Sequence, residues 1–156
     1  MNYIFINKII EQLNRAVADS YILYLNYKRY HWNVSGALFR ELHLLFDEHA
    51  KRMLETVDDF AERVKALGGD AIGAVNEVIE LSDLKSAKSG MSAREMIEQA
   101  IQNHEKLIAR FKQAIKLCES ANDPGSMDLF TRHIQLHEKL RWFLKEHLEK
   151  DSLLDS

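Results

Sequence analysis

The chain has 156 residues, of which 46% are hydrophobic and 29% are charged, a balance typical of one globular domain. Its net charge of -3 does not favour nucleic acid, and its single cysteine excludes an intrachain disulfide and a cysteine-based metal site. No apolar run approaches membrane-spanning length, and the first residues lack the apolar core of a signal peptide. We therefore expect one domain over residues 1–156, in a reducing cytoplasm and without membrane contact.

One proline and six glycines indicate few loops and long helices, so the chain is expected to be all-α. The first helix is predicted over about residues 6–33, because apolar side chains recur there at steps of three and four. His31 continues this core-facing stripe. After a short break, a second helix is predicted over about residues 38–67, ended by Gly68 and Gly69. The short break makes the two helices antiparallel.

A long connection is predicted over residues 70–91, with a short amphipathic helix at 74–81. A third long helix begins at the capping box Ser92-Ala93-Arg94-Glu95 and runs to about Glu119. A crossover of this length lets the third long helix run parallel to the second, as in ferritin-like bundles.

The fourth long helix is predicted to begin near the only proline. Asp123 and Pro124 form a typical N-cap and first-turn pair, although Ser126 is an alternative cap. The helix runs to about Glu149, and the last residues, 151–156, are expected to fray. Four long helices with one long crossover, which holds a short extra helix, predict a ferritin-like four-helix bundle.

Two pairs of potential metal ligands lie on one face of the second helix. His43 and Asp47 stand near its start and Asp58 and Glu62 near its end, each pair at i,i+4 spacing. At ~100° per residue all four fall within a sector of about 100°. His31 should lie near His43, because the first two helices are antiparallel. Imidazole with carboxylate suits iron, zinc or manganese, whereas the alternative is a solvated helix face beside a packed histidine.

The spacing along the helix separates the two pairs. Asp47 and Asp58 are eleven positions apart, or ~16 Å on a helix, which no single ion spans. Both pairs share a midpoint between residues 52 and 53, so a second copy crossing antiparallel there would join them. One two-fold axis at this point, near Lys51 and Leu54, would create two equivalent sites per dimer.

A site inside one bundle is not expected. Ferritin-like di-iron proteins bind iron within the bundle through Glu-x-x-His pairs. No glutamate of this chain has a histidine three residues later. The sequence therefore predicts an intersubunit site.

The string YHWNVSG at residues 30–36, the spacing of the five expected ligands and Arg63 after Glu62 resemble the Dps family of ferritin-like proteins. The stretch DLFTRHIQLHEKLRWFL at residues 128–144 resembles the fourth helix of this family, so the resemblance covers nearly the whole chain. It implies a ferroxidase that oxidises Fe(II), with hydrogen peroxide preferred over dioxygen. It further implies storage of ferric mineral in a hollow dodecamer and protection against oxidative stress.

The resemblance also implies roles for single residues. His31, His43 and Asp47 would bind iron from one subunit, and Asp58 and Glu62 from its mate.

Four further positions have two interpretations each. By resemblance Asp123 and Asp128 would line an iron-entry pore at a three-fold axis, whereas acidic residues at a helix start usually act as caps and dipole partners. Trp32 and Trp142 would absorb stray oxidising equivalents. The alternative for both tryptophans is packing in the core or at an interface.

Many members of the family bind DNA through a lysine-rich terminal tail. Here Lys8 is the only basic residue among the first ten, and the last residues are acidic. A nucleoid-binding structural protein with a secondary iron site is therefore the weaker alternative, and DNA binding is not expected.

The remaining candidates carry weaker signals. His133 and His137 form an i,i+4 pair that could hold a metal, but the sequence indicates no carboxylate partner. Cys118 is interpreted as a small buried hydrophobe. The other histidines carry no signal in the sequence; they are His49, His104 and His147.

Overall fold

The computed structural model describes residues 3–149 and 153–154, which form five helices and no strand. The helices are α1 (Tyr3–Asn33), α2 (Phe39–Ala66), α3 (Val75–Leu81), α4 (Ala93–Ala121) and α5 (Pro124–Glu146). The all-α bundle with a short helix in its crossover is confirmed. The fraying expected at 151–156 falls largely outside the described residues. Within the described part, no helix is long and apolar enough to cross a membrane.

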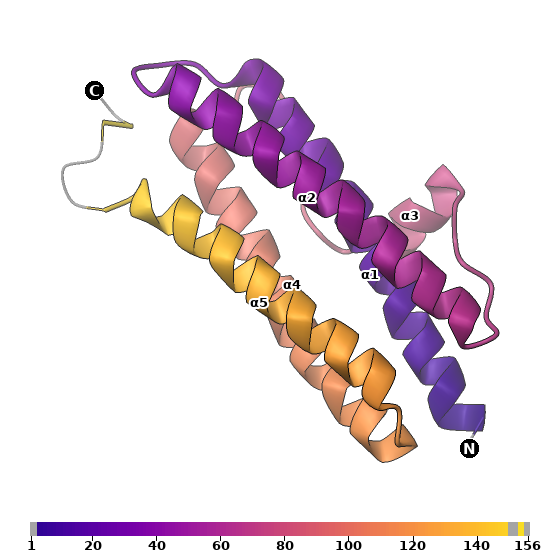
Figure 1. Ribbon diagram of the computed structural model, residues 1–156. Helices are drawn as coiled ribbons and strands as arrows, with labels where there is room; N and C mark the ends of the chain where they lie inside the picture. The colour runs from indigo at the N-terminus through magenta and orange to yellow at the C-terminus, as the bar shows by residue number, and fades with distance from the viewer. Residues whose placement is uncertain (1–2, 150–152, 155–156) are drawn as a thin grey trace.

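The long helices form two antiparallel pairs, α1 with α2 and α4 with α5 (Figure 1). Tyr30, near the end of α1, is hydrogen-bonded to Gln99 near the start of α4. Arg63, near the end of α2, donates to Asp123 where α5 begins. Helix α4 therefore runs antiparallel to α1 and parallel to α2, as the long crossover predicted.

The apolar stripes of the long helices meet in one core. Phe60 of α2 lies against Phe111 of α4 and Phe130 of α5, with ring centroids 5.4 and 5.8 Å apart. Both pairs are tilted, by 51° and 36°, and so avoid the unfavourable face-to-face sandwich. Cys118 is fully buried among these helices, which confirms its interpretation as a core residue.

Local caps set the start of the two later helices. Ser92 accepts a hydrogen bond from the backbone of Glu95, and the Glu95 carboxylate accepts one from the backbone of Ser92, so the predicted capping box is present. The Asp123 carboxylate accepts a hydrogen bond from Ser126 N at 3.0 Å. Asp123 is therefore the N-cap of α5, and the alternative cap, Ser126, lies inside the helix.

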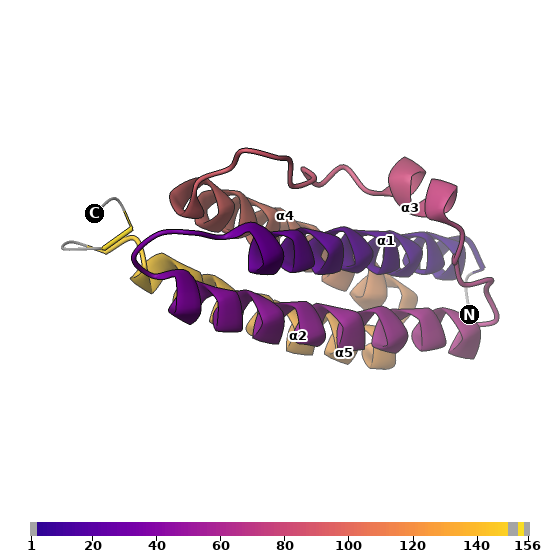
Figure 2. The ribbon, with the colours of Figure 1, turned by 90° about the horizontal axis from the view of Figure 1, so that it is seen from above.

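The crossover runs along the side of the bundle formed by α1 and α4 (Figure 2). Its backbone is bonded by amide side chains of these helices: Asn14 donates to Asp70 O, and Asn26 and Asn103 both donate to Lys85 O. Backbone groups without regular structure need such partners when they lie against a core. The side chains of α1 and α4 thus fix the path of the crossover.

Candidate metal centre

The stacked imidazoles of His31 and His43 form the centre of the candidate site, where α1 ends and α2 begins. Their centroids are 3.9 Å apart and their planes 17° apart. Nδ1 of His31 lies 2.5 Å from the carbonyl oxygen of His43, and Nδ1 of His43 lies 2.7 Å from that of His31. A carbonyl only accepts, so each Nδ1 carries a proton, and Nε2 is the nitrogen of each ring that could bind a metal.

The short turn between the helices produces this pairing. The backbone of Val34 donates to Tyr30 O at 2.8 Å, and its buried side chain anchors the turn. Gly36 has φ of 108°, a conformation that glycine adopts without steric cost. Phe39 N then donates to Gly36 O, and the Phe39 ring stacks on His43. The turn therefore brings the two predicted histidines together, as expected from antiparallel helices.

Asp47, one turn after His43, is the third member of this group. Its Oδ1 atom is 4.0 Å from Nε2 of His31 and accepts a hydrogen bond from Lys28 at 2.9 Å. Its Oδ2 atom lies 3.2 Å from Lys51. The hydrogen bond from Lys28, supported by Lys51, lowers the pKa of Asp47 to about 2. The carboxylate is therefore ionised at neutral pH, and the ammonium groups of Lys28 and Lys51 are its partners in this chain.

The second predicted pair lies elsewhere. Asp58 and Glu62 are exposed on α2, which is continuous over Phe39–Ala66, so the ~16 Å between Asp47 and Asp58 holds. Within the residues that the structure describes, no three His, Cys, Asp or Glu side chains are grouped to hold a metal. One copy of the chain stacks His31 on His43 and places Asp47 4.0 Å from His31, but these three do not form a metal-binding group by themselves, and the other two predicted ligands lie apart from them.

The two acidic residues at the start of α5 differ in their surroundings. Asp123 is 7% exposed and is bonded by Arg63 at 2.7 Å. Burial raises the pKa of Asp123, but the hydrogen bonds from Ser126 and the charge of Arg63 together hold it below its usual value. Asp128 is exposed and forms an ion pair with Arg132 at 2.9 Å. The contacts of Asp123 are those of a cap and helix anchor, and only Asp128 offers its charge to solvent.

The two tryptophans both lie at the surface. Trp32 is 67% and Trp142 56% exposed, so packing in the core of this chain is excluded for either. The Lys28 ammonium lies 5.5 Å from the Trp32 ring centroid, while Trp142 donates to Glu146 at 3.0 Å. Packing at an interface or a redox role remains for both residues.

The two histidines of the weak i,i+4 candidate on α5 have different partners. His133 lies 3.2 Å from Asp59, a carboxylate partner that the sequence did not indicate. His137 is fully buried and faces His104, whose Nδ1 atom is 2.7 Å from its own. Burial lowers the pKa of both His104 and His137, the latter to about 3, so both rings are neutral. The core position of His104 follows from its stripe on α4, three residues from Ile101 and Leu107, a signal that the sequence contains.

Comparison with known proteins agrees with the fold. A long-crossover bundle of four helices defines a ferritin-like protein, and a family model described as a ferritin-like domain matches residues 10–154. The chain is 33% identical over 137 residues to the DNA protection during starvation protein of Brevibacillus brevis, covering 88% of this chain and 92% of that protein. It is 30% identical over 146 residues to DNA protection during starvation protein 1 of Deinococcus radiodurans, covering 93% and 70%.

A solved structure of a Dps protein is also similar to this chain. The X-ray structure of Dps from Thermosynechococcus elongatus is 38% identical to this chain, with a TM-score of 0.92 and 97% of each chain covered. The chain belongs to the Dps family of ferritin-like proteins.

Proposed function

We propose that this protein stores and detoxifies iron in the cytoplasm. It oxidises Fe(II) to Fe(III), preferably with hydrogen peroxide, and keeps the ferric mineral inside a hollow dodecamer. The observation that carries this proposal is the half-site of His31, His43 and Asp47, in which Nδ1 of each ring is bonded to a carbonyl, Nε2 is the nitrogen left for a metal, and the carboxylate is ionised. Nitrogen and carboxylate donors of this kind suit iron.

A second copy of the chain completes the site. Asp47, Lys51, Leu54, Asp58 and Glu62 follow each other at steps of three and four, so they share one face of α2. The last four of these are exposed, and Asp47 is partly so. Leu54 is 45% exposed in the middle of this face, and an exposed apolar side chain between two charged pairs favours a protein contact.

The neighbouring face of α1 extends this surface. Leu25, Lys28 and Trp32 recur at steps of three and four, and Lys28 contacts both Asp47 and Trp32. Leu25 is 58% and Trp32 67% exposed. A two-fold dimer through both faces would cover these apolar side chains and bring Asp58 and Glu62 of one subunit to the half-site of the other.

The side chains of the chain prepare this site for a cation. The carbonyl bonds hold both imidazoles in the tautomer that binds metal, and the lysines keep Asp47 ionised. Fe(II) would take the place of the ammonium groups at the Asp47 oxygens, which limits the net change in local charge. When two irons are bound, the pair supplies two electrons to one peroxide, so hydroxyl radical is avoided. With few strong ligands, Fe(III) is released to the mineral.

The entry of iron and the capture of escaping oxidising equivalents complete the proposal. Asp128, exposed at the start of α5, is proposed to attract cations at a three-fold pore, where a negative potential would raise the entry rate. Asp123 contributes less, because Arg63 neutralises it. Trp32 and Trp142 are proposed to take up oxidising equivalents that escape the site.

Anaerobic Fe(II) oxidation tests the proposal. Peroxide added to the Fe(II)-loaded protein should oxidise about two irons per peroxide with little hydroxyl radical, detected by a spin trap. Size-exclusion chromatography with light scattering should show a dodecamer that retains the ferric product. A protein that oxidises iron no faster than buffer, or one that remains a monomer, would contradict the proposed function.

A further inference from the structure

Two tyrosines of α1 lie side by side in the core but have different hydrogen-bond acceptors. The rings of Tyr27 and Tyr30 meet edge to face with centroids 5.9 Å apart, and both side chains are buried. The Tyr27 hydroxyl is bonded to Nε2 of His104, whereas the Tyr30 hydroxyl donates to the amide oxygen of Gln99. A neutral imidazole nitrogen can take a proton, and an amide oxygen cannot.

The acceptor of Tyr27 is itself linked to a second imidazole. Nδ1 of His104 lies 2.7 Å from Nδ1 of His137, and neither ring has access to solvent. If Nε2 of His104 accepts from Tyr27, its proton is on Nδ1 and is donated to His137. Burial keeps both rings neutral, because it lowers both pKa values. A proton leaving Tyr27 therefore has two consecutive acceptors.

This group is close to the candidate iron site. Tyr27 stands one helical turn before His31 on α1, ~6 Å along the axis. Its ring is covered by Phe46 and His49, at centroid distances of 6.1 and 5.2 Å, and is fully buried. The phenol is thus near the site where oxidants would arise, yet shielded from solvent and from other molecules.

We propose that Tyr27 is a redox-active residue whose proton acceptor is His104. A one-electron oxidant takes one electron from Tyr27, and the phenolic O–H bond breaks as its proton moves to Nε2 of His104. The Nδ1 proton of His104 then passes to Nδ1 of His137. The products are a neutral tyrosyl radical on Tyr27, the reduced oxidant and a protonated His137.

The different hydrogen-bond acceptors of the two hydroxyls explain why Tyr27 and not Tyr30 would react. At Tyr30 no base can receive the phenolic proton, so oxidation would leave the positive charge on the phenol, whose radical cation is a far stronger acid than imidazolium; at Tyr27 the charge moves to an imidazole. The oxidant we infer is the hydroxyl radical formed when a single Fe(II) meets peroxide, which becomes hydroxide on reduction. This source rests on the proposed function, whereas the chemistry of Tyr27 and His104 does not.

Photochemical oxidation without iron tests the inference on the full-length protein. The starting variant carries Tyr3→Phe, Tyr21→Phe and Tyr24→Phe, which leaves the two buried tyrosines as the only phenols. A flash-excited ruthenium polypyridyl complex with persulfate supplies the one-electron oxidant. Freeze-quench EPR and transient absorption then report the yield and lifetime of the tyrosyl radical.

Three further substitutions in this background separate the alternatives. Tyr27→Phe should abolish the long-lived tyrosyl signal, while the matched control Tyr30→Phe should leave it unchanged. His104→Gln gives Tyr27 the kind of acceptor that Tyr30 has. It should slow radical formation roughly a hundredfold, which is the lower end of the rate effect of a positioned proton acceptor. A long-lived signal that persists in Tyr27→Phe, or that His104→Gln does not alter, would overturn the proposal.

A solvent isotope measurement needs no substitution at His104. After full exchange into D₂O, the tyrosyl signal of the starting variant should rise more slowly than in H₂O, because the proton moves with the electron. Equal rates in the two solvents would also overturn the proposal. Because no iron is used, either outcome is independent of whether the protein is a ferroxidase.

Discussion

Arg63 shows how one side chain can connect two helices beside the candidate site. It follows the predicted ligand Glu62 on α2, yet its guanidinium donates to Asp123 and to Ser126 of α5, at 2.7 and 3.0 Å. A Cβ atom on Gly125 would lie 2.6 Å from Nη2 of Arg63, so the glycine leaves space for this contact. The pair holds the end of α2 against the start of α5.

Removing this side chain should therefore destabilise the bundle. Arg63→Ala leaves a nearly buried carboxylate at Asp123 without its counter-charge, and we expect a loss of about 2 kcal/mol in the free energy of unfolding. Urea unfolding at a fixed protein concentration measures it. The control Arg132→Ala removes an ion pair to Asp128 in which both side chains are more than half exposed, and should cost less than about 0.5 kcal/mol. Equal losses in the two variants would contradict this role of Arg63.

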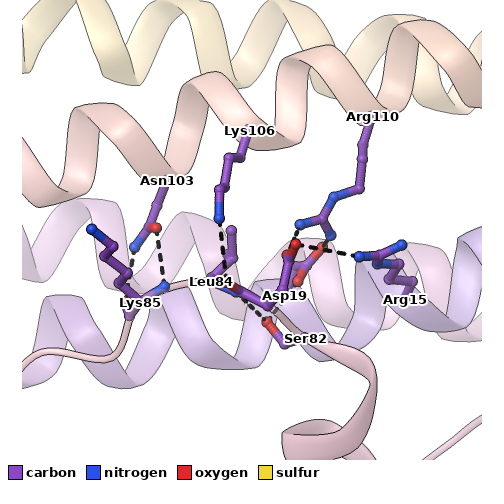
Figure 3. A network of polar contacts seen from close by, with 9 residues as sticks. Arg15, Asp19, Ser82, Leu84, Lys85, Asn103, Lys106 and Arg110 are labelled. Atoms are coloured by element: carbon purple, nitrogen blue, oxygen red, sulfur yellow. Dashed lines mark hydrogen bonds and ion pairs between the residues drawn. The ribbon is translucent and has the colours of Figure 1, made fainter.

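At the scale of elements, the crossover depends on a polar network between α1 and α4 (Figure 3). Arg110 of α4 forms ion pairs with Asp19 of α1 and with Asp83 of the crossover, and Ser82 donates to Asp19 at 2.6 Å. Arg15 lies 3.5 Å from Asp83. The network joins three segments that are distant in the sequence.

The buried carboxylate in this network predicts a pH effect. Burial of Asp19 raises its pKa to about 6, despite the opposing charge of Arg110 and the hydrogen bond from Ser82. Between about pH 4 and 6 the folded state then holds a proton that the unfolded state has lost, so the contribution of Asp19 to stability falls as pH rises through this window. From pH 4 to 7, the stability of the wild type relative to Asp19→Asn should fall by up to about 3 kcal/mol.

Paired urea titrations across this range measure the difference. Asp70→Asn is a control, because Asp70 lies outside this network and is exposed. A difference between wild type and Asp19→Asn that is constant, or that grows with pH, would contradict a raised pKa for Asp19.

The helices could be predicted because their capping residues and their apolar stripes indicate the same boundaries. The capping box at Ser92, the Asp123–Pro124 pair and the apolar stripes all lie where the structure has helix boundaries and buried faces. His31 and His43 meet, with Asp47 4.0 Å from His31, because a short turn forces α1 and α2 together. The partners of polar core residues could not be predicted, since Asp59 with His133 and Asp19 with Arg110 are far apart in the sequence. Only the folded chain brings these residues into contact.

At the scale of the whole molecule, charge bears on the DNA-binding alternative. The formal net charge is -3, with 24 acidic and 21 basic side chains among the 156 residues. Binding of DNA without sequence preference requires several cations that release counterions from the phosphates. The protein should therefore not retard linear DNA near neutral pH at moderate salt. A salt-sensitive shift in a gel without added metal would contradict this prediction and support a structural role on the nucleoid.

The central claim is that each iron site is shared by two subunits, and mixing damaged subunits tests it most directly. One variant carries His31→Ala and His43→Ala, and the other carries Asp58→Ala and Glu62→Ala. Each variant alone should lose fast Fe(II) oxidation, because every site lacks ligands. In a mixed dimer, one site receives both damaged halves and the other receives both intact halves.

Co-expression of the two variants, with mixed dimers counted by native mass spectrometry, gives the decisive measurement. Random pairing makes about half of the dimers mixed, so about a quarter of all sites are intact. We predict that fast Fe(II) oxidation returns at roughly that fraction of the wild-type rate. If mixed dimers are present and the mixture stays inactive, the site is not shared across the two-fold axis.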